Sequence, residues 1–312
     1  MKKTLLSVLV SSVLVLSACD DSTLTQKVLE AEKNIVRLES DLKKSQADLT
    51  AKENELTALK TAQRNDFPGL KVDITTLYHK TEKIKHPKSE ESASDETDIE
   101  LMITAPVTHI EWLDKLLLDE TMKTYTGEEQ KSPVTKEMIT QKSDELFQEY
   151  IASAKEFRPF GLKLMVTSFY LGQRHNIVSF TQTYYDYGGG AHGNYATRYL
   201  NIDTDKKTVM RLDDLIAPKN RQKLQDMLWE NYAESRVDEN GKYNGYAQKE
   251  DFVISPNFYF SGENIIFVYS PYVLGPYAEG EVEIRMSRYL VNELLNPEYQ
   301  YKQSDGFMPQ QD

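Results

Sequence analysis

Residues 160–203 read FGLKLMVTSFYLGQRHNIVSFTQTYYDYGGGAHGNYATRYLNID. Apolar, β-branched and aromatic residues alternate with polar ones over three segments of this stretch, 161–171, 176–187 and 195–202. Such alternation is typical of strands with one buried face. We expect these segments to be strands of a mostly antiparallel sheet.

The flanking sequence supplies further predicted strands and the helices that cover them. Strands are predicted over 70–85, 99–103, 257–260, 265–270 and 281–286. Helices are predicted over 110–125, 135–157, 218–235 and 288–295. The charged run 88–96 between the first two strands is interpreted as a solvated hairpin loop. The predicted fold class is therefore α+β, a mostly antiparallel sheet with helices packed on one face.

The N-terminus has the parts of a bacterial lipoprotein signal. Lys2 and Lys3 supply positive charge, residues 4–16 are apolar, and the LSAC that ends at Cys19 resembles a lipobox. The apolar run is shorter than the about 20 residues that a membrane-spanning helix needs. We therefore expect residues 1–18 to be a signal peptide and Cys19 to carry a lipid anchor, the alternative being an uncleaved signal anchor.

The charge and the cysteine content exclude some classes of site and of partner. Cys19 is the only cysteine, which excludes an intramolecular disulfide and any multi-cysteine metal site. The formal net charge of -12, which becomes -14 when Lys2 and Lys3 leave with the signal, argues against a nucleic-acid partner. Asp20 and Asp21 directly after the cysteine resemble an inner-membrane retention signal. The expected location is the cell envelope, on the periplasmic face of the inner membrane.

Residues 24–63 carry a heptad pattern that neither proline nor glycine interrupts. The pattern predicts a coiled-coil stalk, about 60 Å long at 1.5 Å per residue, that lifts the rest of the chain from the membrane and joins copies into a homo-oligomer. The alternative is a single amphipathic helix packed on the remainder of the chain. The positions with spacings of alternately four and three are Leu24, Val28, Ala31, Ile35, Leu38, Leu42, Ser45, Leu49, Lys52, Leu56, Leu59 and Gln63.

Charges beside this pattern bear on pairing in a parallel dimer. Two pairs would attract and one would repel, and two polar residues weaken the middle of the pattern. The attractive pairs are Lys27/Glu32 and Glu55/Lys60, the repulsive pair is Asp48/Glu53, and the polar residues are Ser45 and Lys52.

Two loops in the C-terminal half have unusual compositions. Residues 187–194, YGGGAHGN, hold four glycines between two predicted strands, and such a loop could offer amide donors to an anion or a sugar. The alternative is a tight structural corner. The candidate ligand-binding residues at this loop are Asp186, Gly189, His192 and Asn194.

Residues 270–280, SPYVLGPYAEG, form the second unusual loop. Two Pro-Tyr pairs make it rigid, and tyrosine offers a large contact area at a low cost in side-chain entropy. The alternative is a structural turn whose tyrosines cover the core. The candidate binding residues here are Tyr272, Pro276 and Tyr277.

Catalytic motifs receive little support. The five histidines form no HExxH pair, the chain has no GxSxG elbow, and no Gly-Lys-Ser/Thr follows the glycine loop. The sequence predicts no metal site and no cofactor, and it favours a protein that is not an enzyme. The alternative is a peptidoglycan- or glycan-modifying enzyme that uses His192 with nearby carboxylates.

The ordered motifs of the C-terminal half resemble those of the RsiV/PdaC family of extracytoplasmic domains. The resemblance covers roughly residues 70–295 and rests on residues 184–194 (YYDYGGGAHGN), 201–203, 212–216, 258–260, 269–272 and 276–280. This chain has three glycines at 188–190 where the family usually has two. The resemblance implies a sensory or binding domain, of which one family member binds lysozyme, with the loop around Pro276 and Tyr277 as the contact site.

These observations predict five parts: a signal peptide at 1–18, a lipid-anchored stalk at 19–65, a PdaC-like region at 66–180, an RsiV-like domain at 181–300 and a polar tail at 301–312. The expected function is that of a membrane-anchored envelope lipoprotein whose periplasmic part binds an extracytoplasmic ligand without catalysis. Lysozyme and peptidoglycan fragments are the expected ligands. An acidic surface attracts cationic partners.

Overall fold

The computed structural model describes residues 22–64, 69–87, 94–131 and 133–300. The predicted signal peptide, Cys19 with Asp20 and Asp21, and the tail at 301–312 lie outside the described residues, as does most of the charged run 88–96. The chain divides into two units, residues 1–63 and 64–312, which we describe separately. None of the described helices has the length and apolar character needed to cross a membrane.

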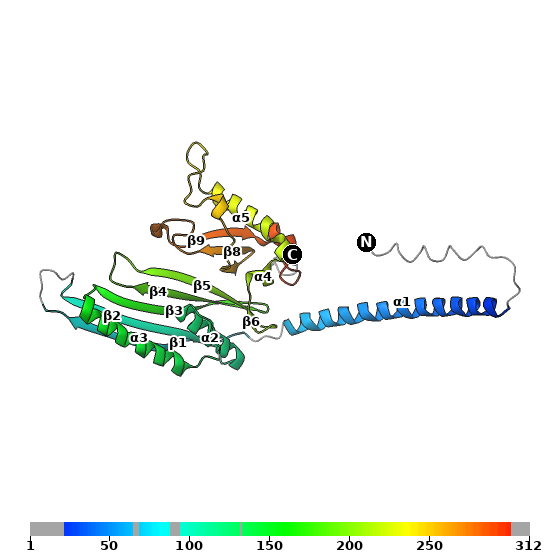
Figure 1. The fold of residues 1–312 in the computed structure, drawn as a ribbon, viewed down its shortest axis with the longest axis horizontal. Helices are drawn as coiled ribbons and strands as arrows, with labels where there is room; N and C mark the ends of the chain where they lie inside the picture. The colour runs from blue at the N-terminus through cyan, green and yellow to red at the C-terminus, as the bar shows by residue number, and fades with distance from the viewer. Residues whose placement is uncertain (1–21, 65–68, 88–93, 132, 301–312) are drawn as a thin grey trace, which may run out of the picture. The chain divides into compact units, whose positions relative to one another are not determined.

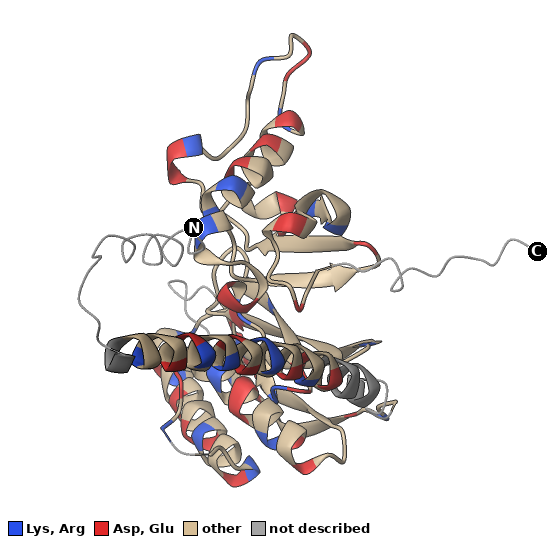
Figure 2. Cartoon of the chain, turned by 90° about the vertical axis from the view of Figure 1, so that its right-hand side faces the viewer, with Lys and Arg blue, Asp and Glu red and all other residues tan. Residues whose placement is uncertain are grey.

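Helix α1 (Ser22–Arg64) makes up the described part of the first unit (Figure 1). Every side chain from residue 25 to residue 56 is exposed, and acidic and basic residues are interspersed along the helix (Figure 2). The predicted long helix is confirmed, because the absence of proline and glycine lets the backbone hydrogen bonds continue. The coiled coil stays a prediction, since the structure holds one chain.

The second unit begins with a six-stranded sheet in which sequence order is also spatial order. Neighbouring strands are antiparallel except β2 and β3, which are parallel, so the sheet is mixed where a mostly antiparallel one was expected. Two helices connect β2 to β3 and return the chain to the end from which β2 started. The strands are β1 (Asp73–Lys85), β2 (Glu96–Val107), β3 (Gly161–Arg174), β4 (Ile177–Tyr187), β5 (Asn194–Asp203) and β6 (Thr208–Val209).

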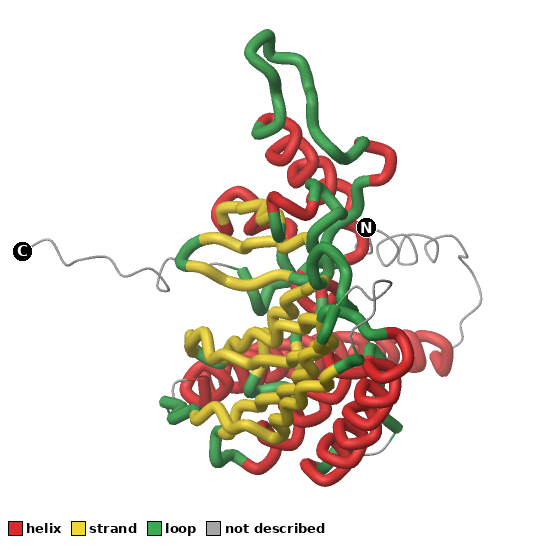
Figure 3. Tube along the Cα trace, turned by 90° about the vertical axis from the view of Figure 1, so that its left-hand side faces the viewer, coloured by secondary structure: helices red, strands yellow, loops and turns green. Residues whose placement is uncertain are grey.

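Helices α2 (Glu111–Thr126) and α3 (Lys136–Phe157) pack on one face of this sheet, as predicted (Figures 1 and 3). Leu113 and Leu117 of α2 pack with β4 and β5, and Ile139 of α3 packs with β1 to β3. Gly127, with φ 75°, ends α2 in the left-handed conformation. Thr135 starts α3 by accepting a hydrogen bond from the Met138 amide at 3.3 Å.

The C-terminal part of the unit forms a separate three-stranded antiparallel sheet, β7 (Phe258–Ser261), β8 (Asn264–Tyr269) and β9 (Val282–Ser287). The sequence predicts these strands but only one sheet, so the existence of a second sheet is a correction. Two short α-helices and four 3-10 helices accompany α5 (Arg221–Glu234), whose buried face contributes Leu224, Leu228 and Tyr232 to the core. The short helices with 3-10 segments are α4 (Leu212–Leu215), η1 (Pro218–Asn220), η2 (Lys249–Asp251), η3 (Tyr277–Glu279), α6 (Arg288–Val291) and η4 (Asn292–Leu294).

Side chains of the C-terminal part make hydrogen bonds to backbone groups at the outer edge of strand β5. Asn257 accepts from the Tyr199 amide at 2.8 Å and donates to the Thr197 carbonyl at 2.6 Å. Glu281 accepts from the Thr197 amide at 2.7 Å. These side chains take up the backbone hydrogen-bonding groups of the edge, which protects it from further strand addition.

The boundary predicted between residues 180 and 181 lies inside β4, so the six-stranded sheet includes residues from both predicted parts.

The hydrophobic clusters of the described chain all lie between residues 70 and 299. Each of them is formed entirely by residues of the second unit. We call residues 66–312 the head and expect it to fold without α1, because its core is complete within that segment.

Candidate ligand-binding site

The two unusual loops come together although about 80 residues separate them in sequence. The glycine loop (187–194) joins β4 to β5, and the Pro-Tyr loop (270–280) joins β8 to β9. The Tyr277 ring stacks on the His192 ring with centroids 3.7 Å apart and planes at 15°. The Tyr277 hydroxyl donates to the Gly193 carbonyl at 2.7 Å, so one tyrosine holds the glycine loop by both its ring and its hydroxyl.

Both nitrogens of the His192 ring are hydrogen-bonded, one to Gly193 and the other to Tyr272. Nδ1 lies 3.0 Å from the Gly193 carbonyl oxygen, and Nε2 lies 3.2 Å from the Tyr272 hydroxyl. Because a carbonyl can only accept, Nδ1 carries the proton, and in the neutral ring Nε2 accepts from Tyr272. We call His192, Tyr272, Tyr277 and Tyr195 the aromatic cluster; Tyr195 meets Tyr277 edge-on at 6.0 Å.

Backbone conformation at three positions makes this arrangement possible. A Cβ on Gly193 would lie 2.5 Å from the Tyr185 ring and 2.6 Å from the Asp186 carbonyl oxygen, so only glycine fits there. Gly280 has φ 78°, and a Cβ there would lie 2.9 Å from the Tyr195 hydroxyl. Tyr272 itself has φ 71°, which costs a non-glycine residue about 1 kcal/mol or more and is typical of functional loops.

The cluster lies at the surface and beside acidic groups. His192 and Pro276 are exposed, and Tyr272 keeps 52% of its surface accessible. Partial removal from water raises the pKa of Tyr277, and the neighbouring tyrosines add to this. Burial also raises the pKa of Glu281, although the hydrogen bond from the Thr197 amide opposes this. The result is an exposed aromatic surface with carboxylates close by.

Some of the predicted site residues are in direct contact with one another, and others are not. Tyr272, Tyr277 and His192 are in direct contact, and Pro276 precedes Tyr277 on the exposed side of the loop. Asp186 and Asn194 face each other at the end of the β4–β5 ladder.

Gly189 has a structural role that fits the tight-corner alternative for its part of the loop. Its φ is 85°, and a Cβ there would lie 2.7 Å from the Pro159 Cβ atom. The backbone therefore needs glycine at this position for close packing against Pro159 and Phe160.

Sequence reasoning missed Gly193, Tyr185 and Tyr195 as parts of the site. Tyr185 and Tyr195 face each other in the β4–β5 register, beside the loop. If residues are paired across the hairpin starting from the glycine loop, these two tyrosines come opposite each other, so the sequence holds a signal for this pair. The close contact of Gly193 with the Tyr185 ring depends on the folded turn and has no local signal.

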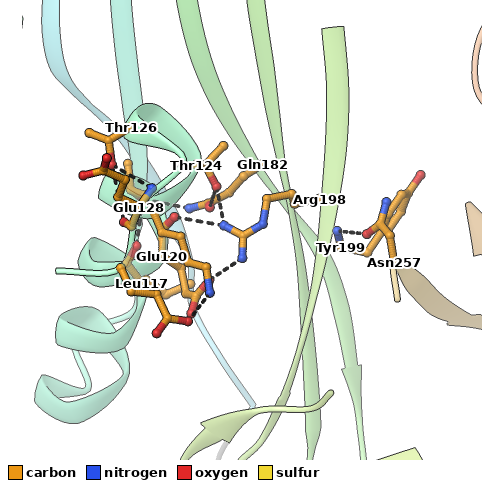
Figure 4. Close-up of polar contacts among 12 residues, drawn as sticks. Leu117, Glu120, Thr124, Thr126, Glu128, Gln182, Arg198, Tyr199 and Asn257 are labelled. Atoms are coloured by element: carbon orange, nitrogen blue, oxygen red, sulfur yellow. Dashed lines mark hydrogen bonds and ion pairs between the residues drawn. The ribbon is translucent and has the colours of Figure 1, made fainter. Parts of the chain in front are cut away.

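A polar network between α2 and the sheet holds strand β5, one of the two strands that the glycine loop joins (Figure 4). Arg198 donates to the Glu120 carboxylate and to the Thr124 hydroxyl, both at 2.6 Å. The Thr124 hydroxyl donates to the fully buried Gln182 at 2.7 Å, and Gln182 donates to Thr121 at the same distance. The buried polar side chains of this network are hydrogen-bonded to one another, so the network stabilises one position of β5.

The surroundings of His192 have the features of a recognition surface. The hydrogen bonds that the structure gives to the His192 ring join it to a carbonyl and a phenol rather than to a carboxylate. Within the described residues, no three acidic, histidine or cysteine side chains form a group that could hold a metal ion. Stacked rings with exposed faces and a strained loop are typical of recognition surfaces.

Comparison with known proteins places part of this region in a family. Residues 213–289, from α4 into α6, match the family model DUF3298, described as a protein of unknown function. The chain therefore carries a DUF3298 domain that includes the Pro-Tyr loop, whereas the glycine loop precedes it. No curated protein sequence matches the chain significantly.

Two solved structures are similar in fold. A member of the DUF3298 family from Bacteroides fragilis superposes with a TM-score of 0.56 and 19% identity, covering 74% of this chain and 96% of that chain. A DUF3298 family protein from Pseudomonas aeruginosa PAO1 gives a TM-score of 0.54 and 14% identity, covering 76% of this chain and 99% of that chain. At these identities the likeness concerns the fold alone.

Proposed function

We propose that this protein is a lipid-anchored envelope protein whose head binds an extracytoplasmic ligand through the aromatic cluster, without catalysing a reaction. The observation that carries this proposal is the meeting of His192 with Tyr272 and Tyr277 at an exposed surface. Two distant loops are held in one arrangement there, and Tyr272 keeps a strained backbone. Strain of this kind is retained where a loop serves recognition rather than packing.

The chemistry around the cluster favours a cationic protein ligand. The formal net charge is -14 after removal of the signal's two lysines, and carboxylates of Asp186, Glu279 and Glu281 lie on or beside the two loops. Opposite charge raises the association rate at low salt. Together with the resemblance to the RsiV/PdaC domains, this supports lysozyme as the first ligand to test and peptidoglycan fragments as the second.

Calorimetry of the head with lysozyme, at low and at physiological salt, tests the proposal. We expect binding that weakens as salt increases, because surface charges are screened. Tyr277→Ala should weaken binding by more than about 1 kcal/mol, as truncation of an aromatic anchor does.

A matched control is Tyr289→Ala, since Tyr289 is 81% exposed and lies on α6 outside the cluster. An equal loss of affinity in both variants would move the site away from the cluster. No binding of lysozyme or of muropeptides at micromolar protein would contradict the proposal. Turnover of muropeptides that His192→Ala abolishes, with folding intact, would favour the enzymatic alternative instead.

A further inference from the structure

Helix α1 carries an apolar stripe of heptad period along one side. The first positions of five successive heptads all carry large aliphatic side chains, and each is about half exposed. Together they run along one side of the helix for more than seven turns. These residues are Val28 (45% exposed), Ile35 (54%), Leu42 (60%), Leu49 (59%) and Leu56 (53%).

We propose that α1 pairs with α1 of a second copy as a parallel, in-register, two-stranded coiled coil, and that Lys52 sets the register. The parallel direction rests on the proposed function, because lipid anchors at Cys19 would hold the N-termini of both helices at the same membrane surface. The second copy is the occupant that the heptad pattern itself specifies, since knobs and holes of period seven fit another helix of the same period.

The residue types at the inward positions favour two strands. Val28 and Ile35 are β-branched at the first two a positions, the next three a positions are leucine, and none of the d positions from Leu24 to Leu59 is β-branched. β-branched residues at a with leucine at d favour a dimer. A stripe only two positions wide also matches the narrow contact of two helices, whereas a globular partner needs a wider apolar face.

Lys52 lies at a d position, where a charge opposes association unless it finds a partner. A lysine at d packs beside the e position of the other helix, which is Glu53 in the in-register pair. Its long stem can follow the apolar contact while the ammonium reaches that carboxylate. The same contact offsets part of the repulsion between Asp48 of one helix and Glu53 of the other; we call these three residues the charge group.

A shifted register breaks up this charge group. Moving one helix by seven residues places Gln46 in place of Glu53 beside one of the two lysines. It also removes apolar layers at both ends of the stripe. Lys52 thus lowers the stability of a dimer in a shifted register more than it lowers the stability of the in-register dimer. A single polar residue is known to set the register of a coiled coil in this way.

Sedimentation equilibrium of residues 20–312 tests the pairing, with the head as reference. We expect residues 20–312 to have twice the monomer mass and the head to have the mass of one chain. A monomeric mass of residues 20–312 across the micromolar range would overturn the proposal, and a trimer would overturn the two-stranded form. Calorimetry on the monomeric head measures ligand binding independently, so failure of pairing and failure of the proposed function are distinguishable.

Two charge reversals test the role of Lys52. Lys52→Glu should weaken the dimer at least tenfold, because it makes all six side chains of the two charge groups acidic. Lys44→Glu is the matched control, since Lys44 lies on the opposite side of the same helix and should leave the dimer constant within about twofold. Equal effects of the two substitutions would show that total charge, and not Lys52, governs association.

Single cysteines test direction and register, because residues 20–312 contain none of their own. Val28→Cys and Leu56→Cys should each form a disulfide-linked homodimer under mild oxidation, since equivalent a positions face each other in a parallel, in-register pair. Ala47→Cys points outward and should remain monomeric under the same conditions. An antiparallel pair would cross-link at most one of the two a positions and would overturn the proposed direction.

Discussion

Gly193 contributes to the site through both its carbonyl and its missing side chain. Its carbonyl oxygen accepts from Tyr277 and from His192, and its Cα lies against the Tyr185 ring. A single backbone group thus joins the glycine loop to the Pro-Tyr loop. By contrast, Gly190 three residues earlier has nothing within 4 Å of its Cβ position.

Gly193→Ala should destabilise the head by about 1–3 kcal/mol, the usual cost of forcing an extra group into a packed site. The added methyl would meet the Tyr185 ring and the Asp186 carbonyl oxygen, and the backbone cannot yield there without moving the β4–β5 ladder. Urea unfolding of the head measures the effect. Gly190→Ala is the control and should stay within about 0.5 kcal/mol of the parent; equal stability of the two variants would refute the argument.

Much of the site could be anticipated at this scale, but its assembly could not. Both loops are conspicuous from local composition, and His192, Tyr272 and Tyr277 can be singled out from it. Their mutual contacts depend on how the second sheet docks on β5, which no local pattern encodes. Gly189 is the opposite case. The composition of its loop singles it out as a candidate binding residue, whereas the structure gives it a packing role against Pro159.

Strand β5 is the element on which the two sheets meet. One edge pairs with β4, and the other is completed by Asn257 and Glu281 rather than by a strand over Thr197 and Tyr199. The carboxylate of Glu281 lies partly buried between β5 and β9, where ionisation is unfavourable and its pKa is raised.

Glu281→Gln should make the head more stable at pH 7 but not at pH 4. The raised pKa means that the folded state binds the Glu281 proton more tightly than the unfolded chain does. Stability contributed by this group is therefore present below the ordinary carboxyl pKa and is lost as pH rises through the raised value. Glutamine keeps an acceptor for the Thr197 amide and has no charge to bury.

Urea unfolding of the parent and the variant at the two pH values checks this prediction. Glu250→Gln, at an exposed position in η2, should show no comparable pH-dependent difference. A parent that is more stable than Glu281→Gln at pH 7 would mean that the hydrogen bond to Thr197 outweighs the cost of burying the charge.

Elements of the fold were predictable where side-chain periodicity is strong. Alternation identifies β3, β4 and β5, and helical spacing identifies α2 and α3 within a few residues of their observed ends. The parallel pairing of β2 with β3 and the separate sheet β7–β9 were not predicted. Periodicity reports which face of a strand is buried but not which strand lies beside it, so pairing must come from tertiary packing.

On the scale of the whole molecule, the proposed function assigns separate tasks to the N-terminus and the head. The hydrophobic clusters described lie within the head, while α1 carries its apolar residues on the surface. We therefore expect position in the envelope to depend on the N-terminal segment and binding on the head, so that each can be altered without the other.

Cys19→Ser should release the protein from the membrane fraction without changing the head. The expected reason is loss of the thioether lipid, whose chains contribute about 0.8 kcal/mol per buried methylene. Fractionation with metabolic labelling by radioactive palmitate checks this. Replacing Asp20 and Asp21 by serine should keep the label and move the protein between membranes, and a labelled Cys19→Ser variant would contradict lipidation at that residue.

The distance in sequence between His192 and Tyr277 also has a consequence for the order of folding. Contacts that close long loops form late, because the chain must first lose the entropy of closing the loop. A partly synthesised or partly translocated chain that ends before residue 270 has the glycine loop but neither tyrosine of the Pro-Tyr loop. Under the proposed function, a chain therefore becomes able to bind only after the Pro-Tyr loop has been made and has docked, so capture of the ligand would report on the folding of the whole head.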